Sequence, residues 1–127
     1  MDPSLVQMAQ QVDASDGVLI QVTLLCGGAR LSGWLISEVR YREILAQTVR
    51  GGTAAQAAPA FDAVTDDARR RRAETAYLRE TRPSVPPSAP EYLYLLEDGE
   101  GTRTWCLPLD RVDAWSMDSF NIALDGE

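Results

Sequence analysis

Carboxylates and arginines are the charged groups with which this chain could do chemistry. Its 127 residues hold 19 Asp and Glu and 12 cations, all of them Arg, with no Lys and no His. Histidine is the commonest general base and a frequent metal ligand, so its absence weighs against most enzyme classes. Without a histidine, none of the serines Ser32, Ser37, Ser116 and Ser119 has an imidazole to activate it. We therefore predict no catalytic residues and no enzymatic activity.

Two acidic clusters have the residue types of an acid–base or a metal site. Glu97, Asp98 and Glu100 offer paired carboxylates, but these residue types at a Gly-containing turn are typical of solvated loops. The acids between positions 62 and 67 lack the spacing of a calcium loop. The pairs Gly27–Gly28 and Gly51–Gly52 also lack the longer glycine pattern and the lysine of a phosphate loop. The sequence thus predicts no metal and no cofactor.

Four consecutive arginines form the most concentrated positive charge. They are Arg69, Arg70, Arg71 and Arg72, inside a predicted helix. Consecutive helical residues lie about 100° apart, so the four side chains do not share one face. Asp66 and Asp67 also precede Arg70 and Arg71 by four residues, a spacing at which opposite charges pair. We favour a solvated, self-paired helix over an anion site, and keep the four arginines as candidate interaction residues.

The three tryptophans are the other candidate interaction residues. Trp34, Trp105 and Trp115 all lie on predicted strands or at strand ends. Core packing is the default for such side chains, although their large area also makes them frequent interface anchors. Core packing is favoured for Trp34 and Trp105. Trp115, among polar neighbours, is balanced between the two roles.

Cysteine usage and charge distribution narrow the class further. Cys26 and Cys106 sit in apolar runs without CxxC spacing, and are expected to be buried free thiols that lie close together if their strands are neighbours. The whole formal charge of −7 falls in residues 91–127, where acids outnumber arginines, while residues 1–90 are balanced. This balance argues against a polyanion such as nucleic acid binding over the whole surface, and favours an acidic surface for a basic partner.

Apolar runs and turn residues predict two β-hairpins. Val18–Ser37 contains two strands separated by Gly27–Gly28, with Gly33 as a bend in the second strand. Strands over 91–97 and 102–109 flank a second turn at 98–101, where Asp-Gly is the hairpin signal. Phe120–Leu124 is predicted as a short last strand.

Helical patterns precede and separate these hairpins. Asp2 and Pro3 open a short helix whose apolar stripe is Leu5, Met8 and Val12. A second helix follows over 38–49, and a third over 61–82. For the third helix the expected buried stripe is Phe61, Val64, Ala68, Thr75 and Leu78. A proline-rich spacer at 82–90 leads to the second hairpin.

The fold class expected from this order is α+β. It is a small, strongly curved antiparallel sheet of four or five strands, barrel-like, with an N-terminal helix and a helical insertion between the hairpins. Residues 1–127 form a single domain with parts 1–50, 51–90 and 91–127. Because the strands are apolar on both faces, self-association into a homo-oligomer is expected. The N-terminus lacks the pattern of a leader, and no apolar run reaches membrane-spanning length, so we expect a cytoplasmic protein without a membrane partner.

Two family resemblances follow from these patterns. A strand, a Gly turn, a strand with a bend glycine and a later strand ending in LPLDRVDAW resemble Sm-like and SH3-like small barrels. That resemblance implies an adaptor or regulatory module that binds a protein or a nucleic acid. The insertion between the hairpins is much longer than the linker of the Sm-like family, and that family's RNA-contact residues have no counterpart here.

The segment VTLLCGGARLSGWLISEVRYREIL resembles the central part of the gas vesicle accessory family GvpU. The residues that match are Gly28, Ser32, Gly33, Leu35, Ile36, Ser37 and Tyr41. The arginine run and the proline-rich link have no counterpart in that pattern. The resemblance implies a cytosolic, non-enzymatic accessory protein whose partners are other copies of itself and gas vesicle shell proteins. We take this as the leading hypothesis, with the adaptor as the alternative.

Overall fold

The computed structural model describes residues 2–86, 90–97 and 103–122, with side chains up to residue 118. The chain divides into two compact units, one of residues 1–37 with 89–127 and one of residues 38–88. The second unit is thus an insertion between the two hairpins. The helix after Ser37 groups with the inserted helix rather than with the first hairpin.

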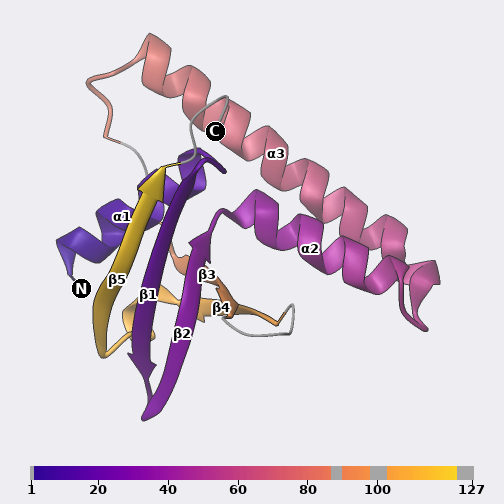
Figure 1. Ribbon diagram of the computed structural model, residues 1–127. Coiled ribbons are helices and arrows are strands. Elements are labelled where there is room, and N and C mark those ends of the chain that lie inside the picture. Colours follow the sequence, from indigo (N-terminus) through magenta and orange to yellow (C-terminus); the bar gives the residue numbers. More distant parts are fainter. Residues whose placement is uncertain (1, 87–89, 98–102, 123–127) are drawn as a thin grey trace. The chain divides into compact units, whose positions relative to one another are not determined.

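The first unit consists of a five-stranded antiparallel sheet and a 12-residue helix. Figure 1 labels its strands and this helix. Its elements are α1 (Pro3–Ala14), β1 (Val18–Cys26), β2 (Ala29–Ile36), β3 (Tyr92–Glu97), β4 (Thr104–Pro108), the single turn η2 (Leu109–Arg111) and β5 (Ala114–Ile122). The strand order is β4-β3-β2-β1-β5, so the last strand returns to pair with the first. The sheet is not closed. The α+β class, the five strands, the N-terminal helix and the helical insertion are confirmed.

The first hairpin forms as its residues predict. Gly27 and Gly28 have φ angles of 56° and 84°, the left-handed values that a two-residue turn of this kind requires. The pairing continues from Cys26 opposite Ala29 to Ile20 opposite Leu35. Only glycine takes both positive φ values without steric cost, which explains why Gly-Gly stands at this turn.

The last strand differs from the sequence prediction. β5 begins at Ala114, six residues before the predicted start at Phe120. Its pairing with β1 shifts between Gln21 and Val22, which face Ser119 and Met117, so Asp118 is the extra residue of a β-bulge. The bulge interrupts the alternation of apolar and polar residues that would have announced this strand. The predicted turn at 98–101 lies outside the described residues.

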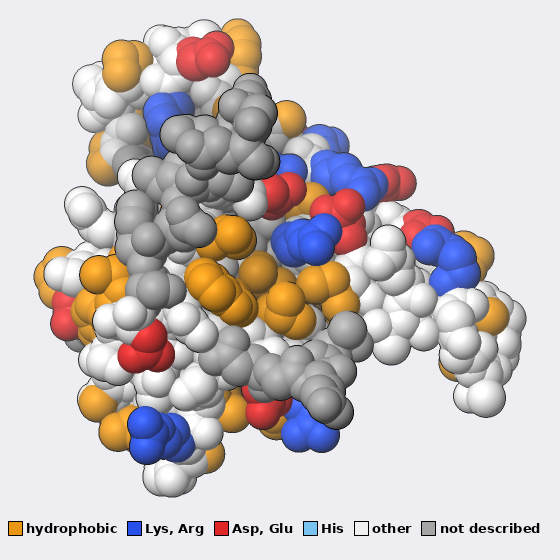
Figure 2. Space-filling view, in the orientation of Figure 1, with side chains coloured by type: hydrophobic (Ala, Val, Ile, Leu, Met, Phe, Trp, Pro, Cys, Tyr) orange, Lys and Arg blue, Asp and Glu red, His pale blue; other side chains and the backbone are white. Residues whose placement is uncertain are grey.

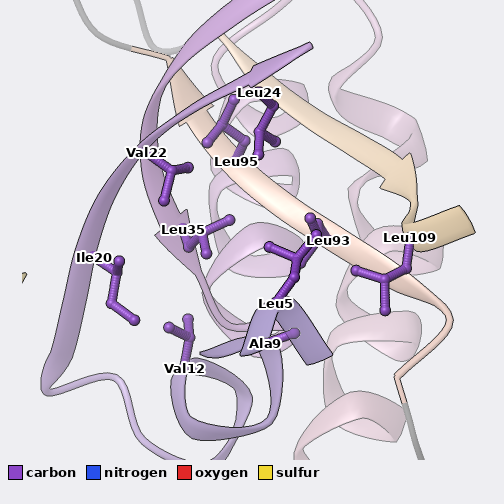
Figure 3. Packing of buried hydrophobic residues seen from close by; sticks show 10 residues of the cluster. All are labelled: Leu5, Ala9, Val12, Ile20, Val22, Leu24, Leu35, Leu93, Leu95 and Leu109. Carbon is purple, nitrogen blue, oxygen red and sulfur yellow. The ribbon is translucent and has the colours of Figure 1, made fainter. Parts of the chain in front are cut away.

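The core lies between α1 and one face of the sheet. The predicted stripe of α1 is confirmed, since Leu5 and Val12 are buried and Met8 packs against the core. Asp2 caps the helix by accepting a hydrogen bond from the Ser4 amide at 2.8 Å. Figure 3 shows the side chains of α1 pointing towards those of the strands. The buried cluster is Leu5, Ala9, Val12, Ile20, Val22, Leu24, Leu35, Leu93, Leu95 and Leu109.

Gly33 is a point of close approach between β2 and β3. A Cβ atom at Gly33 would stand 2.2 Å from the Leu96 carbonyl oxygen and 2.9 Å from the Glu97 Cα. The pairing of β2 with β3 starts at this residue, where Gly33 faces Glu97. The glycine was predicted for a bend, and what the structure shows at this position is the close approach of a neighbouring backbone.

The second unit is a pair of packed helices, α2 (Glu38–Arg50) and α3 (Ala58–Thr81), with the single turn η1 (Ala55–Ala57) before α3. The predicted buried stripe of α3 is wrong in most positions. Ala68 is buried, but the other buried residues are Ala58 and Thr65, while Val64 and Leu78 are 44% and 47% exposed. Small residues face α2 because they let the two backbones approach closely.

Candidate interaction surfaces

Trp105 and Trp115 lie at the margin of the core. Both are half-buried and pack against the buried cluster of the first unit. The Trp105 indole Nε1 donates to Glu97 Oε2 at 2.9 Å, and the Trp115 indole Nε1 donates to Asp2 Oδ2 at 3.2 Å. Each tryptophan therefore buries one side of its ring and presents a polar, carboxylate-bound edge outward.

Trp34 lies on the sheet face opposite α1. It follows Gly33 and precedes the buried Leu35 on β2, and it is paired with Gln21 on β1 and Leu96 on β3. Its side chain is half-buried and does not belong to the core cluster. Unlike the other two tryptophans, Trp34 therefore lies on the second face of the sheet, away from the core cluster.

A polar cluster shares this second face. The Thr23 hydroxyl donates to Asp118 Oδ2 at 2.9 Å and lies 2.9 Å from the Ser32 hydroxyl. Thr23 has one hydroxyl hydrogen, and it is used in the hydrogen bond to the Asp118 carboxylate. Ser32 is therefore the donor in the hydrogen bond between the two hydroxyls. These bonds join β2, β1 and β5 across the sheet, and Asp118, the extra residue of the bulge, takes part in them.

The four arginines predicted as candidate interaction residues lie on α3. Arg69, Arg70 and Arg71 form ion pairs inside the second unit. Arg69 pairs with Asp66 at 3.0 Å and with Glu43 of α2 at 3.3 Å. Arg70 pairs with Asp67. Arg71 pairs with Asp67 at 3.0 Å and with Glu38 of α2 at 2.7 Å.

This self-pairing is what the sequence favoured, although two details differ. Asp66 pairs with Arg69 rather than Arg70. Helical spacing also does not reveal the partners on α2, which are Glu38 and Glu43, or the further ion pair between Arg50 of α2 and Asp62 of α3 at 2.7 Å. Figure 2 shows the Arg side chains interleaved with Asp and Glu side chains on this pair of helices. The arginines of the run are therefore largely neutralised within the unit.

The ion pairs lower the pKa of two carboxyls. The hydrogen bonds from Arg71 hold the pKa of Glu38 below its ordinary value of 4.5, against the opposing effect of its partial burial. The hydrogen bond from Arg70, together with that from Arg71, lowers the pKa of Asp67 below its ordinary 3.8. The same bonds raise the pKa of Arg71. The charged forms are thus favoured in the folded state.

We expect the second unit to lose stability in acid. A carboxyl whose pKa is lowered by folding contributes stability above its unfolded-state pKa, and this contribution is lost as the pH falls through the folded-state value. The free energy of unfolding should therefore be level above about pH 5 and fall below about pH 4.5. Urea unfolding at pH values from 3 to 7, monitored by the circular dichroism signal of the helices, checks this. Glu38→Gln and Arg71→Gln should both flatten the slope, and an unchanged slope in Glu38→Gln would contradict the assignment.

An acidic groove opens beside Trp115 in the first unit. Its volume is about 490 Å³, and it is lined by Asp2, Leu5, Leu109, Asp110, Val112, Asp113, Ala114 and Trp115. Asp2 holds the Trp115 indole, and Asp113 Oδ2 accepts the Gly27 amide at 2.9 Å. Asp110 makes no hydrogen bond or ion pair with the described residues. The sequence predicted the acidic charge of this region. It did not predict that Asp2, at the start of α1, and Asp110, in η2, lie around the apolar side chains of Leu5 and Leu109.

An exposed apolar end of α3 is the second surface that sequence reasoning missed. Tyr77 is 66% exposed and Leu78 47% exposed. The nearby Arg79 and Arg82 have no ion pair with any described residue. The exposure of a leucine that the helical pattern assigned to a buried stripe is the signal that this end has no helix partner inside its own unit.

Both cysteines are free thiols, as expected, but neither is fully buried as predicted. Cys106 on β4 is exposed, and Cys26 on β1 is half-buried, where burial raises the pKa of its thiol. β2 and β3 separate their strands, so the condition for the two thiols to be neighbours is not met. Within the described residues there is no cluster of Cys, Asp and Glu that could hold a metal ion.

Comparisons with known proteins add no assignment, since no family model, no curated protein and no solved structure matches the chain. Among the described helices, none combines the length and apolar character that crossing a membrane requires.

Proposed function

We propose that this protein is a non-enzymatic, self-associating accessory protein of gas vesicles that binds the vesicle shell and influences its assembly or clustering. The observation that carries self-association is the open sheet, whose edge strands β4 and β5 each pair on one side only within the described residues. The vesicle part rests on the resemblance of residues 22–45, which form most of the first hairpin and the start of α2.

Open edges favour contact with another chain because they present unpaired backbone N–H and C=O groups. β5 is the longer edge, with nine residues, and its Met117 is 52% exposed. β4 has five residues and ends at Pro108, which cannot donate a ladder hydrogen bond. Trp34, half-buried on the second face of the sheet, gives a further aromatic contact point for another protein.

Co-flotation tests the proposal. Gas vesicles stripped of loosely bound proteins are mixed with the purified protein and centrifuged at low and at moderate salt. We expect the protein to rise with the vesicles and to increase their clumping. Met117→Lys places a charge on the β5 edge and should reduce clumping, whereas Gln7→Lys, at an exposed position of α1, should not. A protein that stays in the infranatant at both salt concentrations contradicts shell binding.

The alternative is an Sm-like or SH3-like adaptor or regulatory module. The return of β5 to β1 favours it, because a meander whose last strand pairs with its first needs only a contact between β4 and β5 to become a small barrel. Salt-sensitive retention on RNA that is lost in Arg69→Ala with Arg72→Ala would support a nucleic-acid module. Absence of both RNA retention and vesicle binding would leave a protein partner as the remaining form of this alternative.

A further inference from the structure

We propose that copies of this protein join head to tail, with the exposed end of α3 in one copy docked in the acidic groove of a second copy. The α3 tip is defined here as Tyr77, Leu78, Arg79 and Arg82. The acidic groove is the cavity beside Trp115 described above. The inference rests on the self-association proposed in the previous subsection and names the surfaces that carry it.

The length of α3 explains why its tip is free inside the second unit. α3 has 24 residues and α2 has 13. Glu38, the first residue of α2, pairs with Arg71, so α3 continues for about ten residues, roughly 15 Å, past the point where α2 begins. Tyr77 and Leu78 lie in this extension and are 66% and 47% exposed.

Two arginines of the tip also have no ion pair with a described residue of the second unit. The arginines at 69–71 are bound by carboxylates of their own unit, whereas Arg79 and Arg82 have no ion pair with a described residue. Glu74 and Glu80 lie within one helical turn of Tyr77, so the tip carries charges of both signs, with Arg79 and Arg82 towards its end. The tip therefore combines apolar area with unpaired guanidinium groups.

The acidic groove offers carboxylates to these arginines and also combines charged with apolar side chains. Leu5 and Leu109 are buried residues that form its apolar floor. Asp110 is exposed and has no partner among the described residues, and the Trp115 ring forms one wall. Arginine suits such a site, because its planar guanidinium binds carboxylates with paired hydrogen bonds and stacks on indole.

Charge selects an arginine-bearing surface as the partner of the groove. Two grooves would bring carboxylates together and repel each other, whereas the tip offers Arg79 and Arg82, which have no ion pair with a described residue. A tip and a groove attract. The contact is therefore heterologous, and it leaves one unused groove and one unused tip on every pair, from which rings or open chains grow.

Sedimentation velocity of the full chain over a range of concentrations tests this. We expect assemblies larger than dimers at low salt that dissociate as salt rises. We test a tip variant, Leu78→Ser with Arg79→Ser, and a groove variant, Asp110→Arg. Each should raise the protein concentration needed for assembly at least tenfold. Arg30→Ser, at another exposed and unpaired arginine, is the matched control and should assemble as the parent does. Circular dichroism checks that each variant folds.

Mixing the two deficient variants is the decisive arm. Each keeps one intact surface, so the mixture should form one-to-one pairs and nothing larger. Unchanged assembly in both single variants, or no pairing in the mixture, overturns the head-to-tail contact. If only Met117→Lys then dissolves the assemblies, self-association through the sheet edge stands and this inference fails. A parent protein that is monomeric at every concentration overturns the proposed self-association and this inference together.

Discussion

Leu24→Ala is expected to lower the free energy of unfolding by about 2–5 kcal/mol, the cost typical of removing a buried leucine side chain. Leu24 has no exposed surface and lies on β1 between two partner strands, paired with Leu31 on β2 and Trp115 on β5. The cavity left by alanine would border two neighbouring strands and the core beneath α1. Urea unfolding monitored by tryptophan fluorescence gives the change directly.

Leu25 provides the matched control, because it is the same residue type on the same strand and faces the other way. It is 41% exposed. Leu25→Ala should cost less than about 1 kcal/mol, as truncation of an exposed side chain leaves no cavity. The comparison tests the register of β1, since a shift by one residue would exchange the two faces. Equal losses in the two variants would show that this register is wrong.

Gly33→Ala is expected to cost about 3 kcal/mol, at the upper end of the range for overpacking. The added Cβ would meet the Leu96 carbonyl oxygen at 2.2 Å, and both this atom and the Glu97 Cα belong to the backbone of β3. A side chain can rotate away from a clash, but here β3 itself must move, which would weaken its pairing with β2. Hydrogen exchange of the β3 amides should quicken more than that of the β1 amides.

Gly51→Ala is the control for this substitution. A Cβ there would meet only the Gln47 carbonyl oxygen, at an ordinary distance of 3.6 Å. The free energy of unfolding of this variant should therefore lie within about 0.5 kcal/mol of the parent value. Any change should be a small increase, because alanine restricts the unfolded chain. A Gly33→Ala variant that is as stable as Gly51→Ala would show that β2 and β3 lie further apart than the structure has them.

Local sequence signals predicted the parts of the fold that local chemistry specifies. The glycine pair at 27–28 fixes the first turn, and Asp2 with Pro3 starts α1, because a positive φ and a helix cap each depend on one or two residues. The alternation in the first hairpin likewise revealed that Trp34 and Leu35 face opposite sides.

The remaining features depend on partners distant in sequence. The face of α3 that is buried is chosen by α2, so the small residues Thr65 and Ala68 are covered while Val64 is exposed. The bulge at Asp118 depends on the pairing of β5 with β1 and conceals the start of β5. The acidic groove combines the start of α1 with residues more than a hundred positions later. No periodicity in a short window contains such information.

The place of the helical pair within the chain has a consequence for the order of folding. Ile36 and Tyr94 are paired neighbours in the sheet, although the whole insertion of 38–88 separates them in sequence. Bringing the ends of a flexible chain together costs conformational entropy that grows with the logarithm of its length. α2 and α3 pack through residues close in sequence, so they can form before the sheet closes. Once formed, they replace most of that flexible length with a rigid hairpin and so reduce the entropy that β2 and β3 lose when they meet.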